Sequence, residues 1–485
     1  MNAVAAPGSD SPLPLVVDLD GTLTPTDTLV ESVVGLVRQQ PWMLLMLVWW
    51  LLSGRSAFKR QVAAHYRLDV SGLPWRSDLL AWLRAQKASG RPVFLATAAH
   101  EQIAQDAARH LGLFDGVLST QGEVNLKGRH KLVAIQQRLA PRFVYAGDSS
   151  ADLAVWREAQ GAVLVGATAA VAGRARKLTS VEREFPAEAA GLKTWLRAIR
   201  VHQWVKNLLI FVPAFTSFAL LDLHVGLALG LAFLAFSLAA SATYVLNDLW
   251  DLKSDRQHPR KRTRPFASGQ IPLVRALAAV LLLLILGVAL AWQVSPAFAL
   301  VLGGYVVLTT FYSWTLKSYV LLDVLMLAVL YTYRILAGSI ASGIAVSRWL
   351  LAFSVFLFLG LALVKRCAEL VSLRDSGRVG ALGRDYQIHD LAVLWPLGVG
   401  ASLCAVVVLG LYIGSPEAVY LYGDSQVLWL TCLVLTYWNA RMWIKTGRGE
   451  MHDDPIVFAF KDRGTRYATV ALVAIPVIAH LLPGA

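Results

Sequence analysis

Short apolar runs alternate with polar and helical stretches in the first part of the chain, up to about residue 195. Three of these runs end in small or acidic residues: LPLVVDLDGT (13–22), RPVFLATAA (91–99) and RFVYAGDSS (142–150). Short apolar strands separated by helices are typical of a parallel α/β sheet, and such sheets place their functional groups at the carboxyl ends of the strands. We therefore predict a Rossmann-like α/β domain over residues 1–195, with its chemistry at these strand ends.

Downstream of residue 195 the pattern changes to long apolar stretches. A membrane-spanning helix needs about 20 apolar residues, with a range of about 17–25. Nine stretches approach or meet this length, the first being short: 207–222, 225–246, 272–292, 296–315, 320–342, 348–364, 390–413, 427–445 and 467–483. We therefore predict an all-α membrane domain of nine transmembrane helices over residues 196–485.

Composition agrees with a membrane protein and excludes two other classes. The chain has 485 residues, of which 56% are apolar and 16% charged, whereas about a quarter of the residues in soluble domains are charged. The net charge of +13 comes with basic loops beside apolar helices, which indicates membrane topology rather than nucleic-acid binding. The cysteines Cys367, Cys404 and Cys432 have no paired or metal-ligand spacing, so a disulfide scaffold is excluded.

Lys and Arg gather in alternate loops of the membrane domain. The loops after the second, sixth and eighth apolar stretches hold Lys253, Arg256, Arg260, Lys261, Arg262, Arg264, Lys365, Arg366, Arg374, Arg378, Arg384, Arg448, Lys461, Arg463 and Arg466. The opposite connections are short or acidic, apart from Arg348. By the positive-inside rule, we expect a protein of the bacterial inner (plasma) membrane with its N-terminal domain and active sites in the cytosol and its C-terminus outside.

One apolar stretch, PWMLLMLVWWLLSG (41–54), lies within the N-terminal domain. It is too short to span a bilayer comfortably. We favour a helix that lies in the membrane interface, anchored by Trp42, Trp49 and Trp50; a helix buried in the domain core is the alternative.

Two acidic clusters follow separate predicted strands of the N-terminal domain, in DLDGT (18–22) and GDSSAD (147–152), with a hydroxyl and a cation between them. The candidate residues are Asp18, Asp20, Thr97, Lys131, Asp148 and Asp152. A carboxylate nucleophile can approach a dianionic phosphate only if Mg²⁺ and a cation offset the repulsion. The set therefore predicts phosphoryl transfer to an aspartate.

These motifs, in this order from about residue 15 to 170, resemble those of the haloacid dehalogenase phosphatase superfamily. The resemblance implies that Asp18 is the nucleophile and Asp20 the general acid/base. It implies further roles in phosphoryl binding for Thr97 and Lys131 and in Mg²⁺ binding for Asp18, Asp20, Asp148 and Asp152. The insertion over about 25–88 would be a helical cap that screens substrates. A degenerate, inactive domain is the alternative, although no essential motif is missing.

The second apolar stretch of the membrane domain ends in an acidic segment, NDLWDLKSD (247–255). If the helix continues, about 100° of rotation per residue puts four side chains within an arc of about 100°, with Tyr244 on the same face. The four are Asn247, Asp248, Asp251 and Asp255. Clustered carboxylates need a cation, and the basic run 256–264 follows directly, so the segment is suited to a Mg²⁺-bound diphosphate. A solvated helix end is the alternative.

Further polar residues lie at or within the predicted spans. They are Lys206, Asn207, Tyr312, Lys317, Asp323, Arg334, Lys365, Arg366 and Glu369. Ionisable groups inside a span are costly, so a functional role is the first hypothesis. Asp323 and Arg334 are about 20° apart in helical rotation and so share a face. For Arg334 an ion pair between helices is the alternative, and Lys365 and Glu369, four residues apart, are spaced to pair with each other.

This half resembles the UbiA superfamily of intramembrane prenyltransferases, which has nine helices and an N-D-x-x-D-x-x-x-D motif after the second. One departure is that the loop KRCAELVSLRDSGRVGALGRDY (365–386) lacks the second aspartate-rich motif expected there. The branch that resembles decaprenyl-phosphate phosphoribosyltransferase fits better. The matching segments are HQWVKNLLIF (202–211), 247–269, YSWTLKSYVLLDVL (312–325) and DDPIVFAFKDR (453–463), with Lys365, Arg366 and Glu369.

That resemblance implies a bifunctional membrane enzyme with Mg²⁺ in both domains. The transferase would move 5-phosphoribose from phosphoribosyl pyrophosphate to a polyprenyl phosphate. The phosphatase would then remove the 5-phosphate, giving polyprenyl-phosphoryl-ribose for cell-envelope glycan synthesis. The acidic segment, with Asp251 and Asp255 as catalytic residues, would hold the Mg²⁺-diphosphate. The remaining phosphate oxygens would be bound by Arg256, Arg260, Lys261 and Arg262, and the lipid phosphate by Lys206, Arg334 or Lys365.

Two other functions remain open, as does the oligomeric state, a homo-oligomer included. One is a prenyltransferase that moves an isoprenyl group from its diphosphate to an aromatic acceptor, although the missing second motif argues against it. The other is a transporter or receptor with a regulatory phosphatase-like domain; the sequence shows no internal repeat or pair of broken helices of the transporter kind.

Overall fold

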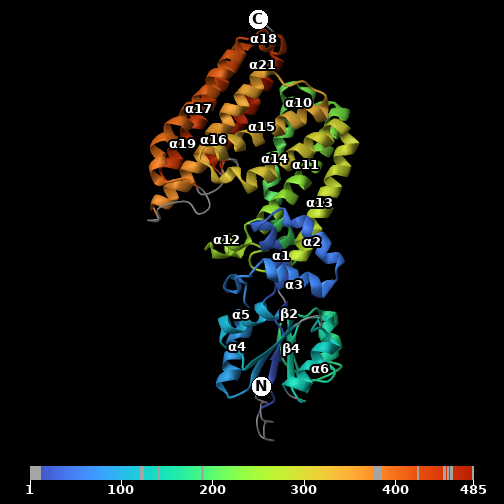
Figure 1. Cartoon of the computed structure of the whole chain (residues 1–485). Helices are drawn as coiled ribbons and strands as arrows, with labels where there is room; N and C mark the ends of the chain where they lie inside the picture. Colours follow the sequence, from blue (N-terminus) through green and yellow to red (C-terminus); the bar gives the residue numbers. More distant parts are fainter. Residues whose placement is uncertain are drawn as a thin grey trace. The chain divides into compact units, whose positions relative to one another are not determined.

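The computed structural model describes residues 12–120, 125–139, 141–186, 190–375, 385–422, 425–451, 455, 458 and 462–482 (Figure 1). The chain divides into two compact units. The first unit contains Met1–Ile199 and Tyr244–Val280, and the second contains Arg200–Thr243 and Leu281–Ala485. The acidic segment 247–255 is therefore part of the same unit as the predicted phosphatase domain.

A six-stranded sheet in the order β3-β2-β1-β4-β5-β6 forms the centre of the first unit, and every neighbouring pair of strands is parallel. The strands are β1 (Leu15–Val17), β2 (Val93–His100), β3 (Gly116–Thr120), β4 (Val144–Gly147), β5 (Gly161–Val165) and β6 (Val181–Phe185). The strand order reverses between β1 and β4, and in such sheets the crevice at the reversal is the usual ligand site. The predicted parallel α/β domain is confirmed.

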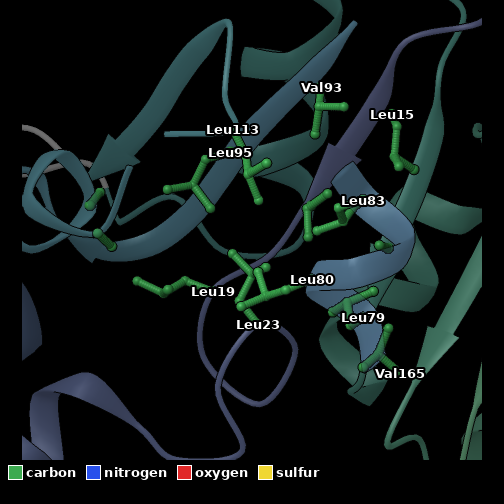
Figure 2. Packing of buried hydrophobic residues seen from close by; sticks show 14 of the residues in the cluster. Leu15, Leu19, Leu23, Leu79, Leu80, Leu83, Val93, Leu95, Leu113 and Val165 are labelled. Atoms are coloured by element: carbon green, nitrogen blue, oxygen red, sulfur yellow. The ribbon is translucent and has the colours of Figure 1, made fainter. Parts of the chain in front are cut away.

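Successive residues of β1 serve opposite faces of the sheet, because side chains alternate along a strand. Leu15 and Val17 belong to one hydrophobic cluster and Val16 to the other. Figure 2 shows the first cluster, in which Leu79, Leu80 and Leu83 of α4 (Ser77–Ala88) gather beside side chains of β1 and β2. Each fully buried leucine stabilises the fold by about 1.5–3 kcal/mol. The other helices of this domain are α5 (Glu101–Leu111), α6 (Arg129–Arg138), α7 (Leu153–Trp156), α8 (Ala169–Ala175) and α9 (Leu192–Ala198).

The insertion after β1 forms a separate helical cap. It consists of α1 (Thr28–Gln39), α2 (Met43–Leu52) and α3 (Arg55–His65), and the Asp27 carboxylate caps the amino end of α1. Because α4 packs in the sheet core, the cap proper is shorter than the predicted 25–88. The helix in the apolar stretch 41–54 is not a core helix, since most of its side chains are exposed.

Seven helices of the described residues are long and apolar enough to cross a membrane, so the chain is an integral membrane protein. They are α11 (Leu223–Trp250), α13 (Leu273–Val294), α14 (Pro296–Trp314), α15 (Leu322–Ser342), α16 (Arg348–Asp375), α17 (Leu391–Ile413) and α21 (Arg463–Leu481) (Figure 1). The remaining helices of this half include α10 (Val212–Thr216), α12 (Leu252–Gln257), α18 (Pro416–Leu421) and α19 (Trp429–Gly447).

The prediction of nine spans was wrong at two of the stretches. The stretch 207–222 is divided between a 3-10 helix, Val201–Phe211, and the short α10, which has Pro213 in its first turn. Proline has no N–H to donate, so it starts a new helix here instead of continuing the one before it. The stretch 427–445 does form a helix, α19, but its mean hydropathy is too low for a span, because Asn439, Arg441 and Lys445 lie among its apolar residues.

Candidate active sites

The residues that follow β1 form a tight turn around the predicted nucleophile. One carboxylate oxygen of Asp18 accepts a hydrogen bond from its neighbour's backbone N–H (Leu19, 2.8 Å), and the other accepts one from Lys131 Nζ at 2.7 Å. Gly21 has φ +79°, and a Cβ there would lie 2.2 Å from a carboxylate oxygen of Asp148. Only glycine fits both the backbone conformation and the space, so the DLDGT motif has a structural reason for its glycine.

The residues after β4 complete an acidic cluster at the point where the strand order reverses. Carboxylate oxygens of Asp18, Asp148 and Asp152 all lie within 4.8 Å of one another. Asp152 is held in place by bonds from Ser149 N–H (3.0 Å) and from the Tyr145 hydroxyl (2.9 Å). The structure thus brings together predicted residues that lie far apart in the chain.

Three further predicted residues surround the acidic cluster in different ways. Lys131 also donates to the Tyr145 hydroxyl at 2.8 Å and is almost fully buried. Thr97, in β2, is fully buried, and its hydroxyl accepts a bond from Ala99 N–H at 3.0 Å. Asp20 lies outside the acidic cluster of the described residues; its carboxylate accepts a bond from Thr28 N–H at 2.8 Å.

The electrostatics of this site indicate an excess of negative charge. Burial raises the pKa of Asp18, even though Lys131 opposes the rise. Burial, with Asp152 and Asp18 nearby, raises the pKa of Asp148 to about 8. For Asp20, burial and then Asp27 raise the pKa to about 7, which is suitable for a group that both donates and accepts protons near neutral pH.

The donor set of the acidic cluster fits a divalent cation. Carboxylate oxygens are the ligands that Mg²⁺ prefers, and a cation among Asp18, Asp148 and Asp152 would relieve the repulsion that raises the pKa of Asp148. Burial alone would lower the pKa of Lys131, but Asp18 and Asp152 outweigh it and raise the pKa. Lys131 therefore stays charged and supplies part of the compensation.

A cavity of about 560 Å³ opens at this cluster. Its polar side contains the acidic cluster, and its apolar side contains Leu51 of α2 and Phe58 of α3. Lys59 of α3, which the sequence analysis did not single out, also lines it and donates to Ala98 O at 2.7 Å and to Asn125 Oδ1 at 3.0 Å. Burial lowers the pKa of Lys59. A lone lysine in a helical insertion gives no sequence signal, so only the fold reveals it.

In the acidic segment 247–255, two carboxylates lie beside the same cation. The helix α11 ends at Trp250, and α12 begins at Leu252. The expected continuous helix is therefore interrupted at Asp251, although the bond from Asp251 N–H to Asn247 O persists at 2.9 Å. Asp248 and Asp255, both buried, accept bonds from the same nitrogen of Arg264, at 3.1 and 2.6 Å.

Arg264 therefore marks a position where a cation is held between Asp248 and Asp255. Carboxylate oxygens are ligands that Mg²⁺ prefers, but the Arg264 guanidinium lies between these two side chains, so they would hold a divalent ion only after Arg264 moves aside. Among the described residues Asp251 does not join them in a cluster close enough for three metal ligands. Arg264 itself was counted only as a loop cation in the sequence analysis, where the run 256–264 gave no reason to choose it.

The neighbouring cations of the loop are arranged differently from the prediction. Arg256 makes a two-bond ion pair with Glu31 of the cap helix α1, at 3.1 and 2.6 Å. Lys261 Nζ lies 3.9 Å from a carboxylate oxygen of Asp255, while Arg260 and Arg262 are exposed. Lys261 and Arg264 thus contact the acidic segment, whereas Arg256 pairs with Glu31.

In the second unit, Arg334 of α15 is buried among aromatic rings. Its guanidinium donates to Asn207 Oδ1 and to the Tyr305 hydroxyl, both at 3.0 Å, and to Leu330 O. It also lies 5.2–5.6 Å from the ring centres of Phe236, Tyr305 and Tyr331. No carboxylate of the described residues pairs with it, so the expected alternative of an ion pair between helices is not found there.

Arg366 of α16, in contrast to Arg334, is paired with carboxylates. It is fully buried and pairs with Asp323 of α15 and with Glu369. The Tyr386 hydroxyl donates to the other oxygen of Asp323 at 2.5 Å. Asp323 therefore pairs with Arg366 across two helices and not with Arg334, whose face of α15 it shares.

The other predicted residues are placed as follows. Lys206 and Asn207 lie in the 3-10 helix Val201–Phe211 and are buried, Tyr244 and Asn247 lie in α11, Tyr312 in α14, Lys317 in the 3-10 turn Leu316–Ser318, and Lys365 in α16. Lys206 Nζ lies 5.6 Å from the ring centre of Tyr331. Most of the predicted segment 453–463 lies outside the described residues.

Comparison with known proteins agrees with this geometry. The UbiA prenyltransferase family profile matches residues 209–475. The chain belongs to this family. A second profile, that of haloacid dehalogenase-like hydrolases, matches residues 15–157, so a hydrolase domain precedes the UbiA domain.

Two groups of relatives are informative. The uncharacterized protein y4nM of Sinorhizobium fredii is 39% identical over 96% of this chain and 90% of its own length, so it shares both domains. Nodulation protein NoeC of Azorhizobium caulinodans is 36% identical over 56% of this chain and 87% of its own. The decaprenyl-phosphate phosphoribosyltransferase of Mycobacterium tuberculosis is 33% identical over 42% of this chain and 70% of its own.

One solved structure is also similar. The structure of a UbiA homolog from Archaeoglobus fulgidus bound to GPP and Mg²⁺ is 17% identical and covers 60% of this chain and 100% of its own, with a TM-score of 0.45.

Proposed function

We propose that this UbiA-family transferase moves 5-phosphoribose from phosphoribosyl pyrophosphate to a polyprenyl phosphate, and that its hydrolase domain then removes the 5-phosphate. The proposal rests on the observation that Asp248 and Asp255 both contact the same guanidinium nitrogen of Arg264, so that the two carboxylates lie on either side of one cation position. One such position is sufficient when only the sugar donor carries a diphosphate. The relatives named decaprenyl-phosphate phosphoribosyltransferase support this choice of substrates.

In the transfer step, a phosphate oxygen of the lipid attacks the anomeric carbon of the ribose. The bond between that carbon and the diphosphate oxygen breaks, and diphosphate leaves with the bonding electrons. Mg²⁺ would neutralise the charge that develops on the leaving group. Asp248 and Asp255 hold the cation, and Arg264 and Lys261, which border these carboxylates, bind phosphate oxygens of the donor.

For the lipid phosphate, Arg334 is a better ligand than Arg366. Arg366 is already neutralised by Asp323 and Glu369, whereas Arg334 is a buried cation whose hydrogen-bond partners are all uncharged. A buried charge without a counter-ion is costly, and an anionic headgroup would supply one. Asn207 fixes the guanidinium in place.

In the hydrolysis step, Asp18 attacks the phosphorus and the bond to the sugar oxygen breaks. Asp20 gives its proton to that oxygen, which leaves as the 5-hydroxyl, while Lys131 and Thr97 hold the phosphoryl oxygens. Asp20 then takes a proton from the water that cleaves the phosphoryl-aspartate, and inorganic phosphate is released. The pKa of about 7 for Asp20 allows it to serve in both directions.

The test is to supply the purified protein with phosphoribosyl pyrophosphate, polyprenyl phosphate and Mg²⁺ and to analyse the lipids by mass spectrometry. The wild-type protein should form polyprenyl-phosphoryl-ribose. Asp18→Asn should accumulate the form with the 5-phosphate, and Asp248→Asn should form no lipid product. If Asp18→Asn leaves the product unchanged, the proposed hydrolysis step is wrong.

A prenyltransferase is the second candidate, favoured by the family profile itself and by Protoheme IX farnesyltransferase 1 of Paramagnetospirillum magneticum, which is 29% identical over 46% of this chain and 74% of its own. Radiolabelled isoprenyl diphosphate decides between the two. Transfer of label to an aromatic acceptor, with no lipid formed from phosphoribosyl pyrophosphate, would establish prenyl transfer.

We also propose that the hydrolase domain lies in the cytosol, because Lys and Arg gather in the loops on its side of the membrane. Labelling of single cysteines with an impermeant maleimide in intact cells tests it. A cysteine in place of the exposed Glu158 should react only after the membrane is permeabilised.

A further inference from the structure

The cap helix α2 has one buried face and one exposed apolar face. Met43, Leu47 and Trp50 are buried in a cluster with Leu36 and Val62 of the neighbouring cap helices. The other apolar side chains of this segment are all exposed: Trp42, Leu44, Leu45, Met46, Val48, Trp49, Leu51 and Leu52. The exposed fraction reaches 78% for Leu45 and 80% for Leu52. We call these eight residues the α2 apolar surface.

This surface differs from the rest of the hydrolase domain. Among the other described residues before residue 200, only Val133, Leu192 and Leu196 are large, hydrophobic and exposed, and they are scattered. Single exposed apolar residues are ordinary, whereas a contiguous patch indicates an interaction site. The buried face keeps the helix folded, so the exposed face is available for a partner.

The charges around the α2 apolar surface indicate what that partner is. From residue 32 to residue 60 the sequence contains no acidic residue, and Arg38, Arg55 and Arg60 flank α2 in the chain, whereas Lys59 lies in the hydrolase cavity. A short apolar helix with tryptophans and basic flanks is typical of a helix that lies in the interface of an anionic bilayer. The described residues of the same chain include seven helices long and apolar enough to cross a membrane, so the chain is itself held at a bilayer.

The α2 apolar surface is also continuous with the hydrolase cavity. Leu51 belongs to the surface and lines the cavity, together with Phe58 and Val62 of α3. The same cavity contains Asp18 and Lys131. A molecule that approaches along this surface therefore meets an apolar wall first and the nucleophile behind it.

We propose that the α2 apolar surface lies in the interface of a bilayer with anionic headgroups and admits a lipid-borne phosphate monoester directly into the hydrolase cavity. The substrate part rests on the proposed function, and the membrane part does not. The lipid tail stays in the bilayer, while the phosphate passes Leu51 to reach Asp18. A water-soluble phosphate ester needs no such contact.

The membrane part is tested with the full chain in vesicles of phosphatidylglycerol and phosphatidylethanolamine. The three native cysteines are replaced by serine, and a single cysteine at Leu45 or Leu52 carries an environment-sensitive fluorophore. A cysteine at Glu158, which is exposed and distant in sequence from the cap, is the matched control. Lipids with a nitroxide near the headgroup should quench the α2 labels, and aqueous iodide should quench the Glu158 label.

Two results would overturn the membrane part. If iodide quenches the Leu45 and Leu52 labels as strongly as the Glu158 label, the surface faces water. If neither quencher reaches them, protein covers the surface, either a second copy or another chain.

The substrate part is tested with Leu45→Asp, which changes an exposed side chain and leaves the buried face of α2 intact. Hydrolysis of the phosphorylated lipid in vesicles should fall by about tenfold or more, because a charged residue opposes interfacial burial. Hydrolysis of p-nitrophenyl phosphate should stay at the wild-type rate, which also shows that the domain is folded. Equal rates on the lipid would refute the entry route.

These results are distinguishable from a failure of the proposed function. If Asp18→Asn does not accumulate phosphorylated lipid, the substrate assignment fails, but the quenching pattern is unaffected. If Asp18→Asn behaves as expected and the α2 labels are open to iodide, the membrane contact alone is wrong.

Discussion

At the scale of single residues, three sets of buried carboxylates each contain a close basic partner, and these basic side chains differ in exposure. Lys131 serves Asp18 and Asp152, and its side chain is 3% exposed. Arg366 serves Asp323 and is fully buried. Arg264, which joins Asp248 and Asp255, has a side chain that is 29% exposed. Arg264 is the most exposed of these three basic side chains, so Asp248 and Asp255 are the carboxylates that we expect to exchange their partner for a metal-bound substrate.

Asp148→Asn should abolish the stabilisation of the hydrolase domain by Mg²⁺. Removing one of three crowded carboxylates relieves repulsion, so the metal-free variant should be as stable as the wild-type protein or more stable. Mg²⁺ should stabilise the wild-type protein, because a ligand that binds only the folded state raises its stability, and should no longer stabilise the variant. Thermal unfolding in detergent, with and without Mg²⁺, measures both.

Asp115→Asn is the control for this prediction, because Asp115 is about half exposed and pairs with Lys87 away from the acidic cluster. It should keep the full response to Mg²⁺. If the unfolding of the hydrolase domain responds to Mg²⁺ as strongly in Asp148→Asn as in the wild-type protein, Asp148 does not hold the cation; a response of the membrane domain is expected in both, from the site proposed at Asp248 and Asp255.

At the scale of secondary-structure elements, charged side chains connect consecutive helices as well as helices that are distant in sequence. Asp323 and Arg366 join α15 to α16, and Glu31 and Arg256 join α1 of the cap to α12 of the acidic segment. Thr26, in the loop between Asp20 and α1, also donates to Glu31 at 2.7 Å. Glu31 therefore links the loop that follows Asp20 to α12, because it accepts bonds from Thr26 of that loop and from Arg256 of α12.

Asp323→Ala should be strongly destabilising, because it leaves the buried Arg366 without its main counter-ion. Removing one partner of a buried pair costs about 3–5 kcal/mol. The double variant Asp323→Leu with Arg366→Met should recover most of this loss, since no buried charge remains. Unfolding in mixed micelles with increasing SDS measures the change for each variant.

The exposed pair Arg374–Asp375 on the same helix is the matched control. Asp375→Ala should change stability by less than about 1 kcal/mol. If Asp323→Ala is equally mild, water or another group compensates Arg366 and the pair is not a structural anchor.

At the scale of the whole molecule, one chain carries a UbiA-family domain and a hydrolase domain. On the proposed function, the product of the first domain is the substrate of the second. A short tether gives an effective concentration of up to about millimolar. The link between α9 and the 3-10 helix Val201–Phe211 is short, since α9 ends at Ala198. The gain in effective concentration matters most for an intermediate that is scarce and stays in the bilayer.

A mixture of two inactive variants should therefore work less well than the intact enzyme. Asp248→Asn lacks the transferase, Asp18→Asn lacks the hydrolase, and together in one vesicle population they still contain both activities. We expect the final lipid to appear after a lag, with the phosphorylated lipid accumulating first, whereas wild-type protein at equal site concentration should show no lag. A time course by mass spectrometry measures this, and identical time courses would show that the tether has no kinetic role.

Much of the hydrolase site was predictable, because its residues follow directly from local pattern. Asp18 and Asp148 each come after a short buried strand, and parallel strands bring their carboxyl ends together at one edge. Lys59 and Tyr145 were not predictable as site residues, since a cap lysine and a strand tyrosine give no signal of their own. In the membrane half, the acidic segment was predicted, but its interruption at Asp251 was not. The two expected spans that are not found fail for reasons inside their own stretches, since Pro213 begins a new helix and α19 is too polar.

The sequence by itself determined the two kinds of domain and the positions of the acidic motifs, because strand alternation, apolar length and adjacency in the chain are local properties. Only the tertiary structure decided which charges meet. Arg264 rather than Arg256 joins the acidic segment, Asp323 pairs with Arg366 rather than Arg334, and the apolar face of α2 remains exposed beside the cavity. These outcomes depend on how the helices and strands pack together. The energy of a buried charge depends on the groups packed around that charge more than on the residues next to it in the sequence.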